Sequence, residues 1–178
     1  ETTKILDVGC GSGILGMLAL KFGAEHSVGT DLDPCAIDAT YENMENNGVS
    51  RDKYEVMIGN IINDKEVQDK VGYECYDIVV ANILADIIIM IQKQVPFHLK
   101  KGGIFISSGI IDMKEQAVRE ALEAAGYTVE SAEEDRIPTS YITLESEDDI
   151  KNMNLLLEHL EDSDDVQEVY HNWENCDE

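Results

Sequence analysis

The sequence predicts an α/β fold with a parallel sheet, followed by an acidic α+β segment. Over residues 1–125, short apolar runs alternate with segments of helical spacing, and glycine-containing turns separate them. Strict alternation of strand and helix implies parallel strands joined by right-handed crossovers. All 13 glycines lie at or before Gly126. We therefore expect two domains, residues 1–125 and residues 126–178.

Five apolar runs are predicted to be the strands of the sheet. The fourth is continuously apolar, which is typical of a strand covered on both faces. The predicted strands are Lys4–Val8, His26–Thr30, Tyr54–Ile58, Tyr76–Ala81 and Ile104–Ser108.

Four further segments of this part have the spacing of helices. Glycine follows the first, second and fourth, Pro34 suits the first turn of the second, and Pro96 is expected to distort the third. The predicted helices are Ile14–Phe22, Pro34 to Asn46 or Asn47, Asp86–Leu99 and Lys114–Ala125.

Charge and cysteine content exclude several classes of function. The 178 residues carry a formal net charge of −24, which repels phosphate backbones and anionic lipid. We therefore expect neither direct nucleic-acid binding nor membrane association. This net charge does not exclude a small local basic patch. The four cysteines lack the paired spacing of metal sites, so we expect reduced thiols, no metal and a cytoplasmic location. The apolar run 78–91 is too short and too polar to span a bilayer.

The acidic residues are not evenly distributed. Residues 126–178 hold 2 of the 13 Lys and Arg but 17 of the 37 Asp and Glu. A second domain and a single domain with an acidic tail both account for this shift.

A glycine loop follows the first predicted strand and carries most of the chemical information. Its sequence is Asp7-Val8-Gly9-Cys10-Gly11-Ser12-Gly13, and with Gly16 it spells the pattern G-x-G-x-x-G, which dinucleotide-binding enzymes share. A carboxylate at Asp7 would repel a pyrophosphate laid over this loop. S-adenosylmethionine carries no phosphate and presents an ammonium and a sulfonium, which a carboxylate complements. The loop therefore favours S-adenosylmethionine as cofactor over a nicotinamide dinucleotide.

Asp31 ends the second strand, where it can accept hydrogen bonds from ribose hydroxyls. Structural roles are the alternative for these acids: Asp7 capping the following turn, and Asp31 or Asp33 capping the second helix. Asp33, directly before Pro34, suits that capping role best.

The stretch KILDVGCGSGILGMLALKFGAEHSVGTDLDPCAIDATYENMENNGV resembles class I S-adenosylmethionine-dependent methyltransferases, which have a Rossmann-like sheet. Two further stretches narrow the resemblance to the PrmA family, over about residues 2–125. They are YDIVVANILADIII and LKKGGIFISSGII. That family modifies a large-subunit ribosomal protein of the stalk base on lysine and N-terminal amines. The resemblance implies a ribosomal protein as the substrate.

The resemblance also implies roles for particular residues. Asp7, Gly9, Gly11 and Gly13 would line the methionine end of the cofactor, Asp31 would bind the ribose, and Asn60 would stand near the adenine. Asn82 would orient the acceptor nitrogen and is the catalytic candidate, with a simple turn role as its alternative. His26 and His98 lack acid partners at useful spacing and are expected to be surface or packing residues.

Two expected parts of that family are missing from the sequence. The N-terminal domain that docks the ribosomal substrate is absent, and so are the two strands that would complete the sheet. Because the chain begins at a core strand without Met, we expect it to be a piece of a longer protein.

The segment from EALEAAGY to HNWE resembles the C-terminal part of the YebC family, described as transcriptional regulators or translation factors. We expect strands at Thr128–Glu133, Ser140–Leu144 and Val166–Tyr170, and a helix carrying Met153, Leu156, Leu157 and Leu160, as part of a ferredoxin-like α+β sandwich. The chain is then a join of two partial proteins near residues 115–127. A non-enzymatic regulator or translation factor is the alternative function.

Overall fold

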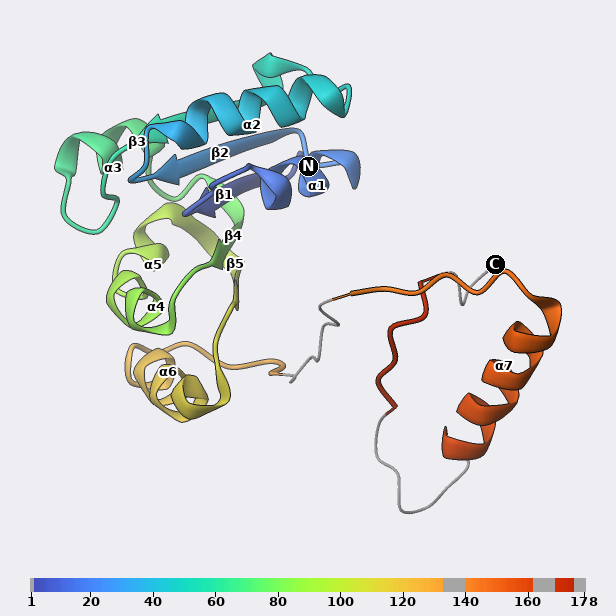
Figure 1. The fold of residues 1–178 in the computed structure, drawn as a ribbon. Coiled ribbons are helices and arrows are strands. Elements are labelled where there is room, and N and C mark those ends of the chain that lie inside the picture. Colours follow the sequence, from blue (N-terminus) through green and yellow to red (C-terminus); the bar gives the residue numbers. More distant parts are fainter. Residues whose placement is uncertain (1, 133–139, 162–168, 175–178) are drawn as a thin grey trace. The chain divides into compact units, whose positions relative to one another are not determined.

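In the computed structural model, the structure describes residues 2–132, 140–161 and 169–174. The chain divides into two compact units, residues 1–130 and residues 131–178. The strands of the described residues all belong to the first unit (Figure 1).

The first unit is a parallel sheet with the strand order β3-β2-β1-β4-β5. This arrangement confirms the predicted α/β class. The strands are β1 (Lys4–Val8), β2 (His26–Asp31), β3 (Tyr54–Ile58), β4 (Tyr76–Asn82) and β5 (Leu99–Ser108). Because the chain runs outward from β1 to β3 on one side and then returns to β4 on the other, the order reverses between β1 and β4.

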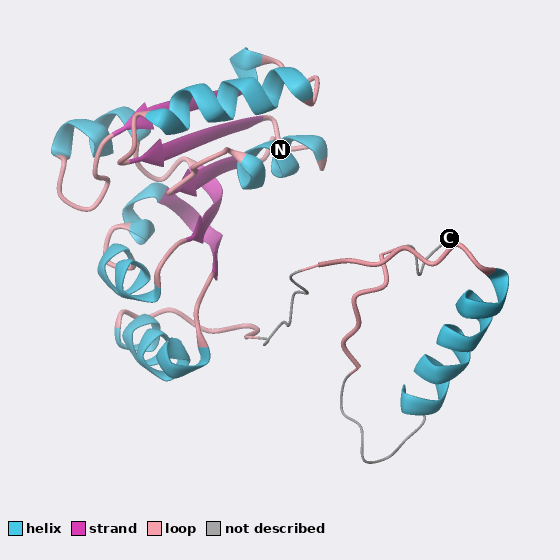
Figure 2. Cartoon of the chain, viewed as in Figure 1, coloured by secondary structure: helices cyan, strands magenta, loops and turns pink. Residues whose placement is uncertain are grey.

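Helices cover both faces of the sheet (Figure 2). The helices α1 (Ile14–Lys21) and α2 (Cys35–Asn46) pack on one face, and the short helix η1 (Arg51–Lys53) leads into β3. The other face is covered by α3 (Lys65–Val71), α4 (Ala85–Ile91), α5 (Val95–His98) and α6 (Asp112–Ala124).

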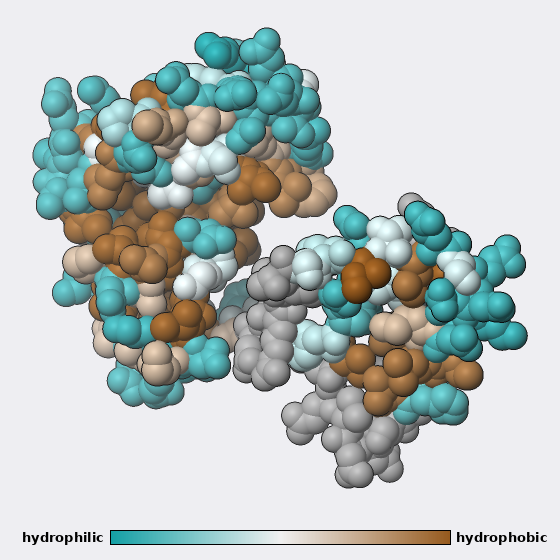
Figure 3. Space-filling model, viewed as in Figure 1, coloured by the Kyte–Doolittle hydropathy of each residue, from teal (hydrophilic) through white to brown (hydrophobic). Residues whose placement is uncertain are grey.

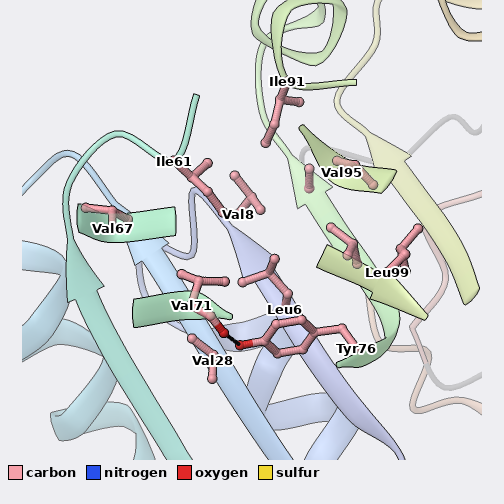
Figure 4. Packing of buried hydrophobic residues seen from close by; sticks show 12 residues of the cluster. Leu6, Val8, Val28, Ile61, Val67, Val71, Tyr76, Ile91, Val95 and Leu99 are labelled. Carbon is pink, nitrogen blue, oxygen red and sulfur yellow. Dashed lines mark hydrogen bonds between the residues drawn. The ribbon is translucent and has the colours of Figure 1, made fainter. Parts of the chain in front are cut away.

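The larger hydrophobic cluster lies between the sheet and α3, α4 and α5 (Figure 4). Leu6 and Val79, at the centre of the sheet, are 0% exposed. Tyr76 joins this cluster and donates a hydrogen bond from its hydroxyl to the carbonyl of Val71, 2.7 Å away. In Figure 3 hydrophobic side chains also reach the surface of this unit; Ile104 and Ile106 of β5 are each 51% exposed.

Two features between β4 and β5 differ from the sequence prediction. The helix expected over Asp86–Leu99 is two helices, α4 and α5, because Pro96 lacks an amide hydrogen and occupies the first turn of α5. The strand β5 begins at Leu99 rather than Ile104, and its pairing with β4 is irregular between Leu99 and Ile104.

The helix α3 was not predicted from the sequence. Asp64 begins this helix by accepting hydrogen bonds from the amides of Glu66 and Val67. Its seven residues are mostly polar, so they carry little hydrophobic periodicity.

The second unit contains α7 (Glu147–Glu161), which confirms the helix predicted around Met153 and Leu157. The strands predicted at Thr128–Glu133 and Ser140–Leu144 are wrong for the described residues, where Ile142 and Trp173 form an isolated parallel bridge. Of the strand predicted at Val166–Tyr170, residues 166–168 lie outside the described residues and the last two residues are not in a strand. In the described parts of the chain, no helix is both long and apolar enough to cross a membrane.

Candidate ligand-binding site

The glycine loop, residues 9–13, joins the end of β1 to α1 and turns tightly. Gly9, Gly11 and Gly13 have φ angles of 72°, 51° and 75°, a left-handed conformation that side chains disfavour. The amides of Gly9 and Cys10 both donate to the carbonyl of Thr30 in β2, at 2.7 and 3.1 Å. The loop is therefore anchored to the carboxyl end of the sheet, at the point where the strand order reverses.

At two of these glycines close packing leaves no room for a side chain, while the third faces open space. A Cβ on Gly9 would lie 2.5 Å from a methyl group of Ile83, and one on Gly13 would lie 2.5 Å from Thr40. A Cβ on Gly11 would meet no atom within 4 Å. The exposed side of the loop at Gly11 is thus free for a ligand to approach the backbone closely, so the residues present fit an organic cofactor of the predicted kind.

Asp31 lies at the end of β2 and connects the loop to the next turn. Its carboxylate accepts hydrogen bonds from the amides of Gly11, at 2.8 Å, and Asp33, at 2.9 Å. Asp33 accepts a hydrogen bond from the amide of Cys35 at the start of α2, which confirms the predicted capping role for Asp33. Asp31 remains partly exposed beside the loop, where its carboxylate can also accept hydrogen bonds from a ligand.

Asp7 lies beneath the loop and is 1% exposed. One carboxylate oxygen accepts hydrogen bonds from the hydroxyl of Tyr54, at 2.9 Å, and from the amide of Gly16 in α1, at 3.1 Å. Burial raises the pKa of Asp7 to about 6, and the nearby charge of Asp31 acts in the same direction, while the two hydrogen bonds oppose the rise. Asp7 therefore holds the first turn of α1, which is the structural role expected as an alternative, and a pKa of about 6 leaves its carboxyl group mostly ionised at pH 7.

The two asparagines lie at the carboxyl ends of β3 and β4, which β2 and β1 separate in the sheet. Asn60, after β3, accepts a hydrogen bond from the amide of Ile62 through its side-chain oxygen. Asn82 is the last residue of β4 and is exposed. Gly109, with a φ of 78°, lies against Asn82, since a Cβ there would be 2.9 Å from the side-chain oxygen. The tip of β4 is thus packed between the loop that follows β1 and the turn that follows β5.

Two residues of α2 that hold the glycine loop were not predicted from the sequence. The Thr40 hydroxyl donates to the carbonyl of Gly11 at 3.1 Å, and the Asn43 amide donates to the carbonyl of Ser12 at 3.0 Å. These residues are three apart and so share one face of the helix. Two polar residues at that spacing on the second helix could have indicated this contact with the loop.

The two histidines lie away from this site. His98 is 1% exposed, stacks on the ring of Tyr73 and contacts the carbonyl of Gly72 through Nδ1 at 2.6 Å. Burial lowers its pKa. This confirms the expected packing role of His98, and His26 begins β2 at the opposite end of that strand from Asp31.

These groups form a site with negative charge and with backbone amides already engaged by protein acceptors. The Gly11 amide is bound to Asp31, and the amides of Gly9 and Cys10 are bound to Thr30. A pyrophosphate would find carboxylates rather than free amides here. The arrangement therefore favours a ligand with hydroxyl groups and positive charge.

Comparisons with known proteins agree with this geometry. Residues 1–137 match the family model "Ribosomal protein L11 methyltransferase (PrmA)". The enzyme of that name from Lachnospira eligens is 57% identical over 120 residues, and the one from Agathobacter rectalis is 55% identical over 129 residues. These alignments cover 67% and 72% of this chain but 38% and 40% of the relatives, so the chain spans about two fifths of their length.

Solved structures of the same fold are also similar. A ribosomal protein L11 methylase from Lactobacillus delbrueckii subsp. bulgaricus has a TM-score of 0.67 and 29% identity, covering 76% of this chain and 66% of that chain. A precorrin 8w decarboxylase from Methanobacterium thermoautotrophicum has a TM-score of 0.60 and 26% identity, covering 72% of this chain and 65% of that one.

A second family model, "TACO1/YebC second and third domain", matches residues 108–173. The two matches share residues 108–137, which include the expected join at 115–127.

Proposed function

Because the chain belongs to the ribosomal protein L11 methyltransferase (PrmA) family, we propose that residues 1–125 bind S-adenosylmethionine and serve methyl transfer to an amine of a ribosomal protein. The observation that carries this proposal is the glycine loop at the reversal of strand order, open at Gly11 and flanked by the carboxylate of Asp31. The acceptor would be a lysine or N-terminal amine, as in the family.

The residues of the site have distinct proposed roles toward this cofactor. Gly9, Gly11 and Gly13 shape the backbone surface against which its methionine end lies. Asp31 accepts hydrogen bonds from the ribose hydroxyls, and Asn60 stands near the adenine. Asp7 does not reach the surface, so we propose that its charge acts through the loop above it on the positively charged end of the cofactor.

Catalysis then depends mainly on placement. When bound, S-adenosylmethionine supplies a methyl group on a sulfonium that is already activated for displacement. The site would hold that methyl group in line with a neutral amine of the acceptor, which would displace the sulfur, gain the methyl group and pass a proton to water. We propose that Asn82 accepts a hydrogen bond from the amine and aligns its lone pair, without adding charge to the site.

Binding of the demethylated product, S-adenosylhomocysteine, tests the proposed cofactor. We expect isothermal titration calorimetry to detect S-adenosylhomocysteine binding and a rise in Tm, because the ligand binds the folded state. NADH serves as the comparison, since it presents a pyrophosphate to the same loop. Binding of NADH without binding of S-adenosylhomocysteine at millimolar concentration would contradict the proposal.

Replacement of Asn82 tests the acceptor site separately. Asn82→Ala should leave S-adenosylhomocysteine binding within about twofold of the wild type, because the side chain lies at the tip of β4 and not in the glycine loop. Methyl transfer to ribosomal protein L11, followed by mass spectrometry, should fall about 100-fold in kcat with the loss of orientation. Equal losses in binding and transfer would argue for a purely structural turn at Asn82.

Residues 126–178 are proposed to form a separate module. The division of the chain at residue 130 and the second family match support this proposal. All the cofactor-binding and catalytic candidates lie before residue 125.

A further inference from the structure

The side chain of Tyr54 extends from β3 past β2 and lies beneath the glycine loop of the cofactor site. It is the first residue of β3 and is 0% exposed, yet its hydroxyl donates to Asp7 of β1 at 2.9 Å. The intervening strand β2 provides Gly29 at this level. A Cβ on Gly29 would lie 3.0 Å from the Tyr54 ring, so the glycine gives the ring room to extend toward β1.

The same ring supports the first turns of α1. A Cβ on Gly16 would lie 2.5 Å from the Tyr54 hydroxyl oxygen, so the ring packs directly against this helix. The Gly16 amide donates to the same Asp7 oxygen that Tyr54 contacts, and its carbonyl accepts a hydrogen bond from Ser27 at 3.0 Å. Tyr54, Asp7 and the beginning of α1 thus form one packed unit below the glycine loop.

We propose that Tyr54 is a positioning residue for the cofactor site that acts through Asp7, fixing its carboxylate beneath the glycine loop in the ionised form. This inference rests on the proposed binding of S-adenosylmethionine. Tyr54 does not itself touch the ligand, because its side chain is fully buried under the loop.

The charges around Asp7 explain why a donor is needed there. Asp31 faces it from the end of β2 and disfavours its negative charge. Cys10 faces it from the glycine loop and stays a neutral thiol, because burial raises its pKa to about 12. The α1 backbone contributes the Gly16 amide, and α2 contributes the neutral side chain of Thr40 near Cys10. The Tyr54 hydroxyl is the side-chain group that lowers the pKa of Asp7.

The test compares Tyr54→Phe with Tyr76→Phe. Tyr76 is 3% exposed and donates to the Val71 carbonyl at 2.7 Å on the opposite face of the sheet (Figure 4), so the control loses an equally buried hydrogen bond away from Asp7. S-adenosylhomocysteine affinity is measured by calorimetry between pH 5.5 and 8.5 for the wild type and both variants. Any titration of the ligand itself is common to all three proteins.

Loss of a hydrogen bond to a charged group should move the midpoint of the affinity profile of Tyr54→Phe upward by about one pH unit. The variant should then bind about threefold more weakly than the wild type at pH 6.5 and equally at pH 8.5. The profile of Tyr76→Phe should keep the wild-type midpoint even where its Tm falls. If the profiles of Tyr54→Phe and Tyr76→Phe both superimpose on that of the wild type, the positioning role is refuted.

A ligand-free measurement separates this inference from the proposed function. The carboxyl carbon of Asp7 is titrated by ¹³C NMR in the three proteins. If the wild type binds no S-adenosylhomocysteine at any pH, the proposed function fails. An upward shift of the Asp7 titration in Tyr54→Phe alone still supports the coupling, and equal titration in all three proteins overturns it.

Discussion

Gly11→Ala should weaken cofactor binding at least about tenfold while leaving the fold intact. The φ angle of Gly11 is 51°, so an alanine there costs about 1–2 kcal/mol of backbone strain. Its Cβ meets no protein atom within 4 Å and therefore causes no clash in the free protein. The methyl group would instead stand on the open side of the loop, where we propose that the ligand contacts the backbone. We expect S-adenosylhomocysteine affinity to fall at least about tenfold, equivalent to about 1.4 kcal/mol.

Gly48→Ala is the matched control for this prediction. Gly48 has a φ of 65°, also has open space around the position of a Cβ, and follows the C-cap of α2, away from the glycine loop. Both variants should lose similar free energy of unfolding in urea, and calorimetry should find the loss of binding in Gly11→Ala alone. A Gly11→Ala protein with wild-type affinity would place the ligand elsewhere.

The local features of the fold were predictable from the sequence. The bounds of β1 and β3 agree with the predicted Lys4–Val8 and Tyr54–Ile58, because glycine and polar turns interrupt short apolar runs at both ends. The capping role of Asp33 was predictable because it depends on residues two positions apart. In contrast, the role of Tyr54 depends on a contact across 47 sequence positions and on the absence of a side chain at Gly29, so its position in an apolar strand suggested only a core residue.

Beyond residue 126, in contrast, the local sequence predicted strands that the described residues do not form. Ser140–Leu144 contains the strand-forming residues Tyr141, Ile142 and Thr143, but a strand also needs a partner to satisfy its backbone hydrogen bonds. In the described part of the second unit, Ile142 and Trp173 form an isolated parallel bridge, and the residues beside them are not assigned to a strand. In the first unit, β1 is hydrogen-bonded to β2 on one side and to β4 on the other. The apolar runs there therefore form strands, as predicted.

Asp7→Asn should make the free energy of unfolding less dependent on pH and should weaken binding at the cofactor site. The folded-state pKa of Asp7, about 6, lies above its ordinary value of 3.8. Protonation therefore favours the folded state: this stabilisation is fully present below pH 3.8 and is lost as the pH rises through 6. Between pH 5 and 8 the loss amounts to about 1.5 kcal/mol. The interval stops at pH 5 because the isoelectric point is about 4.2.

Asparagine cannot ionise, so the difference in free energy of unfolding, Asp7→Asn minus wild type, should increase by about 1.5 kcal/mol from pH 5 to pH 8 in urea denaturation. Any pH-independent cost of burying the new amide cancels in this comparison. S-adenosylhomocysteine affinity at pH 8 should fall, because the negative charge beneath the loop is gone. A relative stability that is the same at both pH values would show that the fold does not raise the pKa of Asp7, so that its carboxylate is already ionised at pH 5 in the folded wild type. If the variant gains stability and still binds normally, the carboxylate serves only to hold α1. Greater stability with weaker binding would instead show that a charge costly to the fold is retained for the ligand.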